Sequence, residues 1–311
     1  MHGIRRVDPS QVTEAQRAEK RKKIAKYVAM RDDVLAMRKD RRHDKEALAL
    51  TRQVLEINPE LYSLWNYRRE ILLGMMDKRS CDVAELLADE LNVVGRAIQR
   101  NPKSYVSWHH RLWVVQRGGS DILKEIDLTS QFLMADARNF HCWDYRRSLV
   151  DLSNVSPSEE LEFTRKKIND DFSNYSAWHY RSTLLTKIGI DQEVLDREFA
   201  LVADCFFTEP DDQSAWLYHR WLCVQHPDIA CLEKQLSIMD ELLDLEPNCK
   251  WALLTSVRLL SELCRLDRTR SVPKRRIGDI FNRLPVLDPQ RKTYYRDLCD
   301  RICVQLGPCI E

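Results

Sequence analysis

The residues of this chain that are best suited to chemistry are cations at the predicted start of a helix. Five residues before the tryptophan of each copy of a repeated block stand Glu60, Lys103, Arg138, Ser173 and Asp211. Two adjacent copies therefore place a cation in a first helical turn, where the helix dipole favours an acid. A bound anion would remove the conflict, since a helix start with a lysine suits a phosphate group. The alternative is a solvent-facing Lys103 that costs a few tenths of a kcal/mol.

The repeated block places an aromatic residue, a tryptophan and an arginine three residues apart, which predicts that all three share one helix face. We expect the tryptophans to pack one helical hairpin against the next; they are Trp65, Trp108, Trp143, Trp178 and Trp216. The arginines are Arg68, Arg111, Arg146 and Arg181, with Arg220 one place late in the fifth block. A guanidinium at an interface needs several acceptors. Either the arginines pair with carboxylates or carbonyls of the adjacent repeat, or they form a subunit interface with a partner protein.

The sequence contains no self-sufficient catalytic motif. It has no Gly-rich phosphate loop, no H-x-x-x-H or C-x-x-C metal motif and no G-x-S-x-G nucleophile elbow. The histidines occupy different positions of the block, so three or four would have to converge across repeats to bind a metal. The ten scattered cysteines are typical of small buried apolar residues in a reduced, intracellular protein. We therefore expect a partner of a catalyst, with no metal or cofactor bound by this chain alone.

Charge and hydropathy exclude several other classes of protein. The 49 basic and 48 acidic residues leave a net charge near +1, which gives no global field for binding nucleic acid. Two local basic runs, at 17–26 and 265–276, are typical of solvated surface. No apolar run approaches the eighteen or so residues of a membrane span, and the N-terminus lacks an apolar signal region. These features predict a cytoplasmic protein without direct membrane insertion.

The spacing of the blocks predicts the elements that carry them. Successive tryptophans lie 35 to 43 residues apart, and such a period is typical of repeat architectures. Only 8 glycines and 11 prolines interrupt the chain, so helix is favoured almost everywhere. Each block follows an amphipathic stretch and a short polar break; the breaks are Asn58-Pro59, Asn101-Pro102, Asp136-Ala137, Asp171-Phe172 and Glu209-Pro210. Asn or Asp before Pro indicates the start of a helix, so each break should separate the two helices of a hairpin.

The predicted fold is all-α, with about fifteen helices and almost no strand. About seven stacked hairpins should form a right-handed superhelical crescent, an α-α solenoid that makes 1–311 a single domain. The repeat blocks lie near 58–73, 101–115, 136–150, 171–185 and 209–223. The signature erodes in two capping repeats at 246–266 and 288–306. At the other end, residues 12 to 38 predict one long charged helix that caps the first hairpin.

The blocks resemble the repeats of protein prenyltransferase α subunits over essentially the whole chain. The resemblance is carried by Asn101-Pro-Lys-Ser-Tyr-Val-Ser-Trp-His-His-Arg, Asn139-Phe-His-Cys-Trp-Asp-Tyr-Arg-Arg, Asn174-Tyr-Ser-Ala-Trp-His-Tyr-Arg-Ser and Asp212-Gln-Ser-Ala-Trp-Leu-Tyr-His-Arg-Trp. Within that family, 140–147, 206–216 and the opening Met1-His2-Gly3 are similar to the Rab (type II) geranylgeranyltransferase branch. The chain departs from longer members of that branch, because it has neither an inserted β-sandwich nor leucine-rich repeats.

The resemblance implies a division of labour between two subunits. The α subunit wraps a β subunit that holds the catalytic zinc and the isoprenoid pocket, and geranylgeranyl diphosphate is the co-substrate. The enzyme acts as this heterodimer on C-terminal cysteines of Rab GTPases that an escort protein presents. By position, Lys103, Tyr105 and His141 match family residues near the diphosphate, which implies that they support its departure.

His2 and the identity of the complex leave further alternatives open. A free N-terminal tail with His2 could reach the open zinc position of the partner, because a neutral imidazole is a good zinc ligand. One alternative function is the α subunit shared by farnesyltransferase and type I geranylgeranyltransferase. From a different class, the chain could be a non-enzymatic helical-repeat scaffold.

Overall fold

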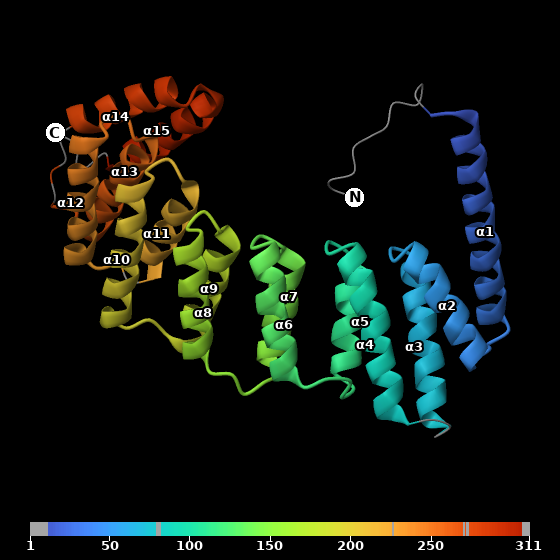
Figure 1. Cartoon of the computed structure of the whole chain (residues 1–311). Coiled ribbons are helices and arrows are strands. Elements are labelled where there is room, and N and C mark those ends of the chain that lie inside the picture. Colours follow the sequence, from blue (N-terminus) through green and yellow to red (C-terminus); the bar gives the residue numbers. More distant parts are fainter. Residues whose placement is uncertain (1–11, 79–81, 226, 270, 272–273, 307–311) are drawn as a thin grey trace. The chain divides into compact units, whose positions relative to one another are not determined.

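The computed structural model describes residues 12–78, 82–225, 227–269, 271 and 274–306 (Figure 1). This part of the chain forms fifteen α-helices and one short 3-10 helix, and it contains no strand. The helices are α1 (Glu14–Lys39), α2 (Lys45–Ile57), α3 (Tyr62–Asp77), α4 (Val83–Arg100), α5 (Tyr105–Val115), α6 (Ile122–Ala135), α7 (Phe140–Asp151), α8 (Pro157–Asp170), α9 (Tyr175–Ile188), α10 (Gln192–Thr208), α11 (Gln213–Gln225), α12 (Ile229–Leu245), α13 (Lys250–Leu266), α14 (Lys274–Leu287), η2 (Pro289–Arg291) and α15 (Lys292–Leu306). The all-α prediction is confirmed.

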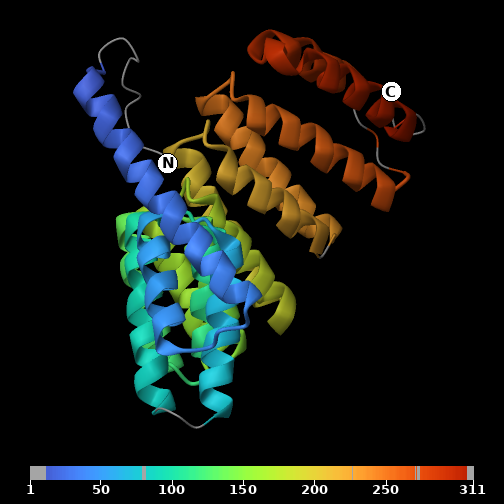
Figure 2. The same ribbon diagram turned by 90° about the vertical axis from the view of Figure 1, so that its right-hand side faces the viewer.

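The helices after α1 pair into seven hairpins, from α2 with α3 to α14 with α15. The chain divides into two compact units, 1–155 with α1–α7 and 156–311 with α8–α15. In unit 1 the second helices contact one another in the order α3, α5, α7, and in unit 2 in the order α9, α11, α13, α15. Within each unit the hairpins therefore stack as a solenoid does, and Figure 2 shows α14 and α15 side by side in unit 2. Whether 1–311 acts as a single domain stays a prediction.

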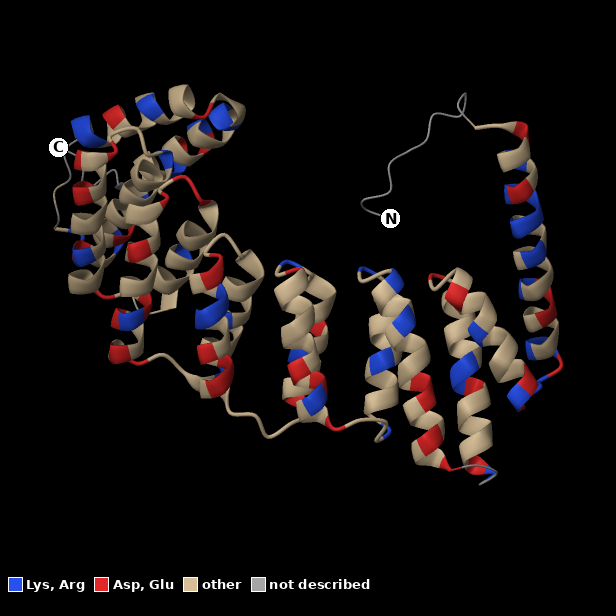
Figure 3. Ribbon diagram, in the orientation of Figure 1, with Lys and Arg blue, Asp and Glu red and all other residues tan. Residues whose placement is uncertain are grey.

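The long charged helix predicted over 12–38 is confirmed as α1. Thr13 caps it, because the Thr13 side chain accepts from the Gln16 N–H while the Gln16 side chain accepts from the Thr13 N–H. Basic residues outnumber acidic ones along its length (Figure 3), and Val34 is its buried residue. Its contact with α2 covers the first hairpin of unit 1.

The polar breaks separate the two helices of each hairpin, but they do so by ending the first helix. Asn58, Asn101, Asp136, Asp171 and Glu209 are C-caps, and the next helix begins about four residues later. Four of these C-caps, all except Glu209, form an Asx turn: Asn101 Oδ1, for example, accepts from the Lys103 N–H at 3.3 Å, and Asp136 Oδ1 accepts from the Arg138 N–H at 3.1 Å. The predicted helix start is therefore wrong, and both cations lie in the turn ahead of the helix.

Each block tryptophan is hydrogen-bonded to the turn that precedes its own helix. The five indole rings are 0 to 4% exposed. In every copy the indole Nε1–H donates to the backbone carbonyl six residues earlier; the acceptors are Pro59, Pro102, Ala137, Phe172 and Pro210, at 2.7 to 2.9 Å. A buried indole N–H needs such an acceptor. Because of this bond, the tryptophan both fills the core and sets the path of the chain between the two helices.

Candidate functional site

Lys103, Tyr105 and His141 come together where α5 and α7 begin in unit 1. The Tyr105 ring is 67% exposed and meets the His141 ring edge-on, with the ring centroids 4.2 Å apart. The Phe140 ring lies 4.0 Å from His141 and 5.7 Å from Tyr105. Asn139 holds this helix start in place, because its side chain accepts from the His141 and Cys142 N–H groups. The arrangement is an exposed aromatic patch with a buried imidazole beneath it.

The charges around this patch leave a cation available to a ligand. Lys103 Nζ lies 3.4 Å from Asp136 Oδ2, and these two side chains are 47% and 41% exposed. An ion pair this exposed contributes about 0 to 1 kcal/mol, so a more highly charged anion can replace the carboxylate. Burial lowers the pKa of His141. The charge of Lys103 lowers it further, whereas Asp144 and Glu60 act to raise it. The net change is a decrease, so the imidazole is neutral near pH 7. A neutral imidazole can orient an anion, and the half-exposed Lys103 ammonium beside it can neutralise one.

The block aromatic three residues before each tryptophan is exposed, although the sequence predicted a shared face with the buried tryptophan. In unit 1 these residues are Tyr62, Tyr105 and Phe140, which are 65%, 67% and 46% exposed, and in unit 2 Tyr175 is 55% exposed. Each is the first residue of its helix, so no preceding turn of its own helix covers it. Within unit 1, large exposed apolar groups at the same position of successive repeats form a surface suited to contact with a partner. The periodicity of the block could have revealed this row once the helix starts were known.

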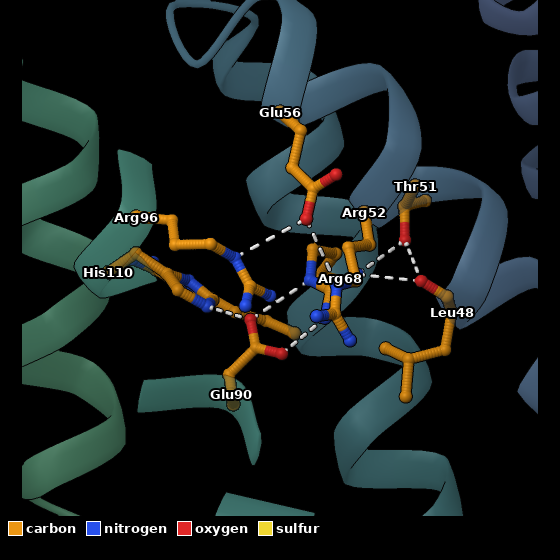
Figure 4. Close-up of polar contacts among 9 residues, drawn as sticks. Leu48, Thr51, Arg52, Glu56, Arg68, Glu90, Arg96 and His110 are labelled. Carbon is orange, nitrogen blue, oxygen red and sulfur yellow. Dashed lines mark hydrogen bonds and ion pairs between the residues drawn. The ribbon is translucent and has the colours of Figure 1, made fainter. Parts of the chain in front are cut away.

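The block arginines lie inside the protein, as Arg68 illustrates (Figure 4). Arg68 Nε donates to Glu90 at 2.9 Å, and Nη2 donates to the other oxygen of the same carboxylate. Arg68 Nη1 donates to the Leu48 carbonyl at 2.7 Å and to Thr51 Oγ1 at 2.9 Å. Glu90 also lies 2.6 Å from His110 Nε2. Glu90 therefore joins the arginine of one hairpin to the histidine of the next.

We call this arrangement a joint: a buried glutamate that links the arginine of one hairpin to a side chain of the next. The same joint recurs between later hairpins. Glu125 accepts from Arg111 and from the Tyr145 hydroxyl, each at 2.7 Å. Glu198 accepts from Arg181 and from the Tyr218 hydroxyl, also at 2.7 Å. The fourth arginine, Arg146, donates to the Ile126 carbonyl, Thr129 Oγ1 and Ser130 Oγ at 2.9 to 3.2 Å.

This bonding decides between the two alternatives for the arginines. Arg68, Arg111, Arg146 and Arg181 are only 2 to 8% exposed and bind within the chain, which corrects their assignment to a subunit interface. The carboxylate partners of Arg68, Arg111 and Arg181 belong to the following hairpin, whereas the acceptors named above for Arg146 lie on α6 of its own hairpin. Arg220 is exposed, and its assignment to an interface stays a prediction.

The fifth block replaces both members of this joint together. His219 stands at the arginine position, and its Nε2 lies 3.1 Å from Gln235 Oε1 on α12, where both side chains are buried. Burial lowers the pKa of His219 to about 4, so the pair is neutral at pH 7. A charged joint has thus become a neutral one at the same place. Sequence reasoning missed the glutamate and glutamine partners, because each lies in the first helix of the following hairpin.

Metal ligands do not gather in the described part of the chain. No group of three or more His, Cys, Asp and Glu side chains there is arranged to hold a metal ion. His2, which the sequence suggested could reach a partner's zinc, lies outside the described residues. None of the described helices combines the length and apolar character needed to cross a membrane.

Comparison with known proteins agrees with this geometry. The family described as "Protein prenyltransferase alpha subunit repeat" matches residues 44–75, 87–118, 122–153, 157–188 and 195–226. The "Geranylgeranyl transferase type-2 subunit alpha" of Dictyostelium discoideum is 36% identical, over 97% of this chain and 100% of the relative. The protein of the same name from Schizosaccharomyces pombe is 33% identical, over 97% of this chain and 98% of the relative.

Longer relatives and a solved structure extend the comparison. The mouse "Geranylgeranyl transferase type-2 subunit alpha" is 42% identical over 75% of this chain, but the match spans only 44% of that relative. The structure of "Candida albicans protein geranylgeranyltransferase-I complexed with GGPP" superposes with a TM-score of 0.73 at 24% identity, covering 89% of this chain and 91% of that one. At that identity the likeness shows the fold alone.

Each matched repeat contains one tryptophan block and its indole hydrogen bond to the preceding turn, which we call the tryptophan latch. Together with 36% and 33% identity to two relatives over nearly the whole of each chain, these five matches identify the family. The chain belongs to the protein prenyltransferase α-subunit family.

Proposed function

We propose that this chain is the α subunit of a type-2 geranylgeranyl transferase and acts only in complex with a β subunit. The observation that carries the proposal is the 36% identity to the Dictyostelium α subunit over the full length of that relative. In this complex, geranylgeranyl diphosphate is the co-substrate, and the acceptors are C-terminal cysteines of Rab GTPases that an escort protein presents. The complex works in the cytoplasm.

The contribution of this chain is electrostatic. The zinc belongs to the β subunit, where it would supply an activated thiolate of the acceptor cysteine. Lys103 leaves Asp136, whose exposed ion pair is weak, and turns to the diphosphate. Tyr105 offers its exposed ring and hydroxyl at the same edge, and His141 holds that ring from below. Negative charge that develops on the departing diphosphate is thereby neutralised from across the subunit interface.

The exposed aromatic row supports the docking of a β subunit. Tyr62, Tyr105, Phe140 and Tyr175 stand at equivalent helix starts, and tyrosine is enriched where protein interfaces bury large rings. His2 would lie in the N-terminal tail, from which it would reach the zinc of the β subunit. Replacing His2 with alanine should then change the metal coordination or the basal activity of the complex.

One experiment separates the proposed function from its alternatives. The chain is co-expressed with each candidate β subunit, and the purified complex is assayed for geranylgeranyl and farnesyl transfer to a Rab protein with its escort protein. We expect association with a type-2 β subunit and geranylgeranyl transfer. Association with a farnesyltransferase β subunit and farnesyl transfer would instead identify the shared α subunit. Failure to associate with any β subunit would leave the helical-repeat scaffold.

Lys103→Ala tests the catalytic role within that complex. Loss of a charge-assisted contact to the diphosphate should slow single-turnover prenyl transfer about 10- to 100-fold. Lys124→Ala, which removes an exposed lysine of α6, is the matched control and should leave transfer unchanged. Asp136→Asn keeps the oxygen that accepts from the Arg138 N–H, frees Lys103 and should tighten diphosphate binding a few-fold. An unchanged single-turnover rate in Lys103→Ala contradicts the role.

A further inference from the structure

Unit 2 contains a half-open pocket of about 490 Å³ between α11, α13 and α15. A volume of this size is typical of ligand sites in proteins. Part of its lining is aliphatic, and the apolar residues include Val224, Leu259, Leu298 and Ile302. Four guanidinium groups share the same lining; they belong to Arg220, Arg258, Arg265 and Arg301. The pocket therefore combines apolar surface with concentrated positive charge.

These cations outnumber the acids available to them. Among the described residues that line the pocket, Glu262 is the one acid, and both of its oxygens accept from Arg265 Nε at 3.0 Å. Arg258 Nη2 donates to the Tyr294 hydroxyl at 2.6 Å, and Arg301 Nε donates to the Asp297 carbonyl at 3.3 Å. Within the described chain, no carboxylate forms an ion pair with Arg220, Arg258 or Arg301. Among the described residues, three positive charges around one cavity thus have no carboxylate partner.

Arg258 carries the largest electrostatic cost of this arrangement. Its side chain is partly buried, and burial lowers its pKa; the nearby Arg220 lowers it further, while Tyr294 opposes the change. A partly buried guanidinium beside a second one is costly unless an anion neutralises both. A carboxylate can accept two parallel bonds from such a group, which makes it a well-matched ligand.

The other polar groups of the pocket indicate binding rather than catalysis. Burial raises the pKa of the Cys223 thiol to about 12, so this cysteine is not a nucleophile near pH 7. His219 is fully buried and bonded to Gln235, which leaves it neutral and occupied. The pocket therefore has cations and apolar walls to offer, but no reactive group.

We propose that this pocket binds a carboxylate side chain of the β subunit, presented on an aliphatic peptide segment. The proposal rests on the proposed function and deepens it. The unpaired arginines favour a carboxylate on the bound segment by charge complementarity. The aliphatic lining, including the 71% exposed Val224, favours apolar residues beside that carboxylate. The pocket lies entirely within unit 2, mostly on the second helices α11, α13 and α15, and it opens to the surface, so a segment of a partner protein can enter it.

The test measures how tightly the purified chain binds a β subunit. Arg258→Met and Arg220→Met should each raise the dissociation constant about tenfold or more, because each removes a charge-assisted contact. The salt dependence of binding should also become shallower in both variants, which a purely structural defect would not cause. Arg275→Met is the matched control, since its side chain is 92% exposed on α14, outside the pocket. Unchanged affinity and salt dependence in Arg258→Met overturn the proposal.

Two further measurements keep the result unambiguous. Tyr294→Phe removes the Arg258–Tyr294 hydrogen bond but leaves the charge, so it should weaken binding less than Arg258→Met. Calorimetry with inorganic diphosphate on the chain alone tests whether the pocket takes a small anion instead: tight, Arg258-dependent binding with normal β-subunit affinity overturns the proposal. If the wild-type chain binds no β subunit at all, the proposed function fails first, and the two failures are thereby distinguished.

Discussion

Glu90→Gln is the sharpest test of how the hairpins are joined. Glu90 is 1% exposed and is bonded by Arg68 and His110, so the substitution keeps the shape and removes the charge. Burial alone would raise the pKa of Glu90, but Arg68 and His110 outweigh it and lower the pKa from 4.5 to about 2. A shift of that size corresponds to about 3 kcal/mol, similar to the measured cost of breaking a buried ion pair. We expect Glu90→Gln to lose about 3 kcal/mol of unfolding free energy.

The sign of the pH dependence follows from the same shift. A carboxyl whose pKa is depressed in the folded protein stabilises it above the ordinary value of 4.5, and that stability is lost as the pH falls toward 2. Wild type should therefore lose stability through this window, and Glu90→Gln should lose less there. A fifteen-helix repeat protein need not unfold in one step, so urea unfolding should be combined with hydrogen exchange over α2 to α5.

A double variant separates a lost charge from lost packing. Combining Arg68→Met with Glu90→Gln leaves a neutral amide at position 90 beside His110, much as Gln235 lies beside His219 in the fifth block. The double variant should be more stable than Glu90→Gln alone, because no uncompensated cation remains buried. Single effects below about 1 kcal/mol that simply add in the double variant would refute the reasoning.

Two further predictions concern the joints and the latches. His219→Arg should lose about 3 kcal/mol of unfolding free energy by burying an unpaired cation, and adding Gln235→Glu should restore much of it; thermal unfolding of both variants checks this. Trp143→Phe should cost about 1 to 3 kcal/mol, because it leaves the Ala137 carbonyl without the indole and opens a small void, whereas the half-buried Trp113→Phe should cost less than about 1 kcal/mol in urea unfolding.

The sequence predicted the helices well because their signals are local. Apolar period, helix propensity and the tryptophan spacing act within one hairpin, and all seven hairpins were expected. The helix starts were placed too early, since Asn101 and Asp136 form Asx turns that end one helix rather than begin the next. That local choice depends on the conformation of the C-cap, which the residue types leave open.

The candidate site was predictable only in part. Lys103, Tyr105 and His141 lie at one edge of unit 1, and the family resemblance had singled out these three residues; their role at the diphosphate stays a prediction. The hydrogen-bond partners of the arginines could not be predicted, because the glutamates that bind them are brought close only when adjacent hairpins pack together. The carboxylates Glu90, Glu125 and Glu198 have no fixed spacing from the arginines they bind, and the pocket of unit 2 combines three helices distant in sequence.

The tryptophan latch has a consequence for how the chain folds. Its donor and acceptor are six residues apart, so closing the bond costs little loop entropy and does not require a neighbouring repeat. Each turn can therefore form early and alone, while the glutamate joints wait for the next hairpin to arrive. During synthesis, the turn between the two helices of each hairpin would therefore already be formed when that hairpin leaves the ribosome. A hairpin newly added by gene duplication would likewise contain the residues that form its own turn, and it would need only a compatible adjacent hairpin in order to pack into the solenoid.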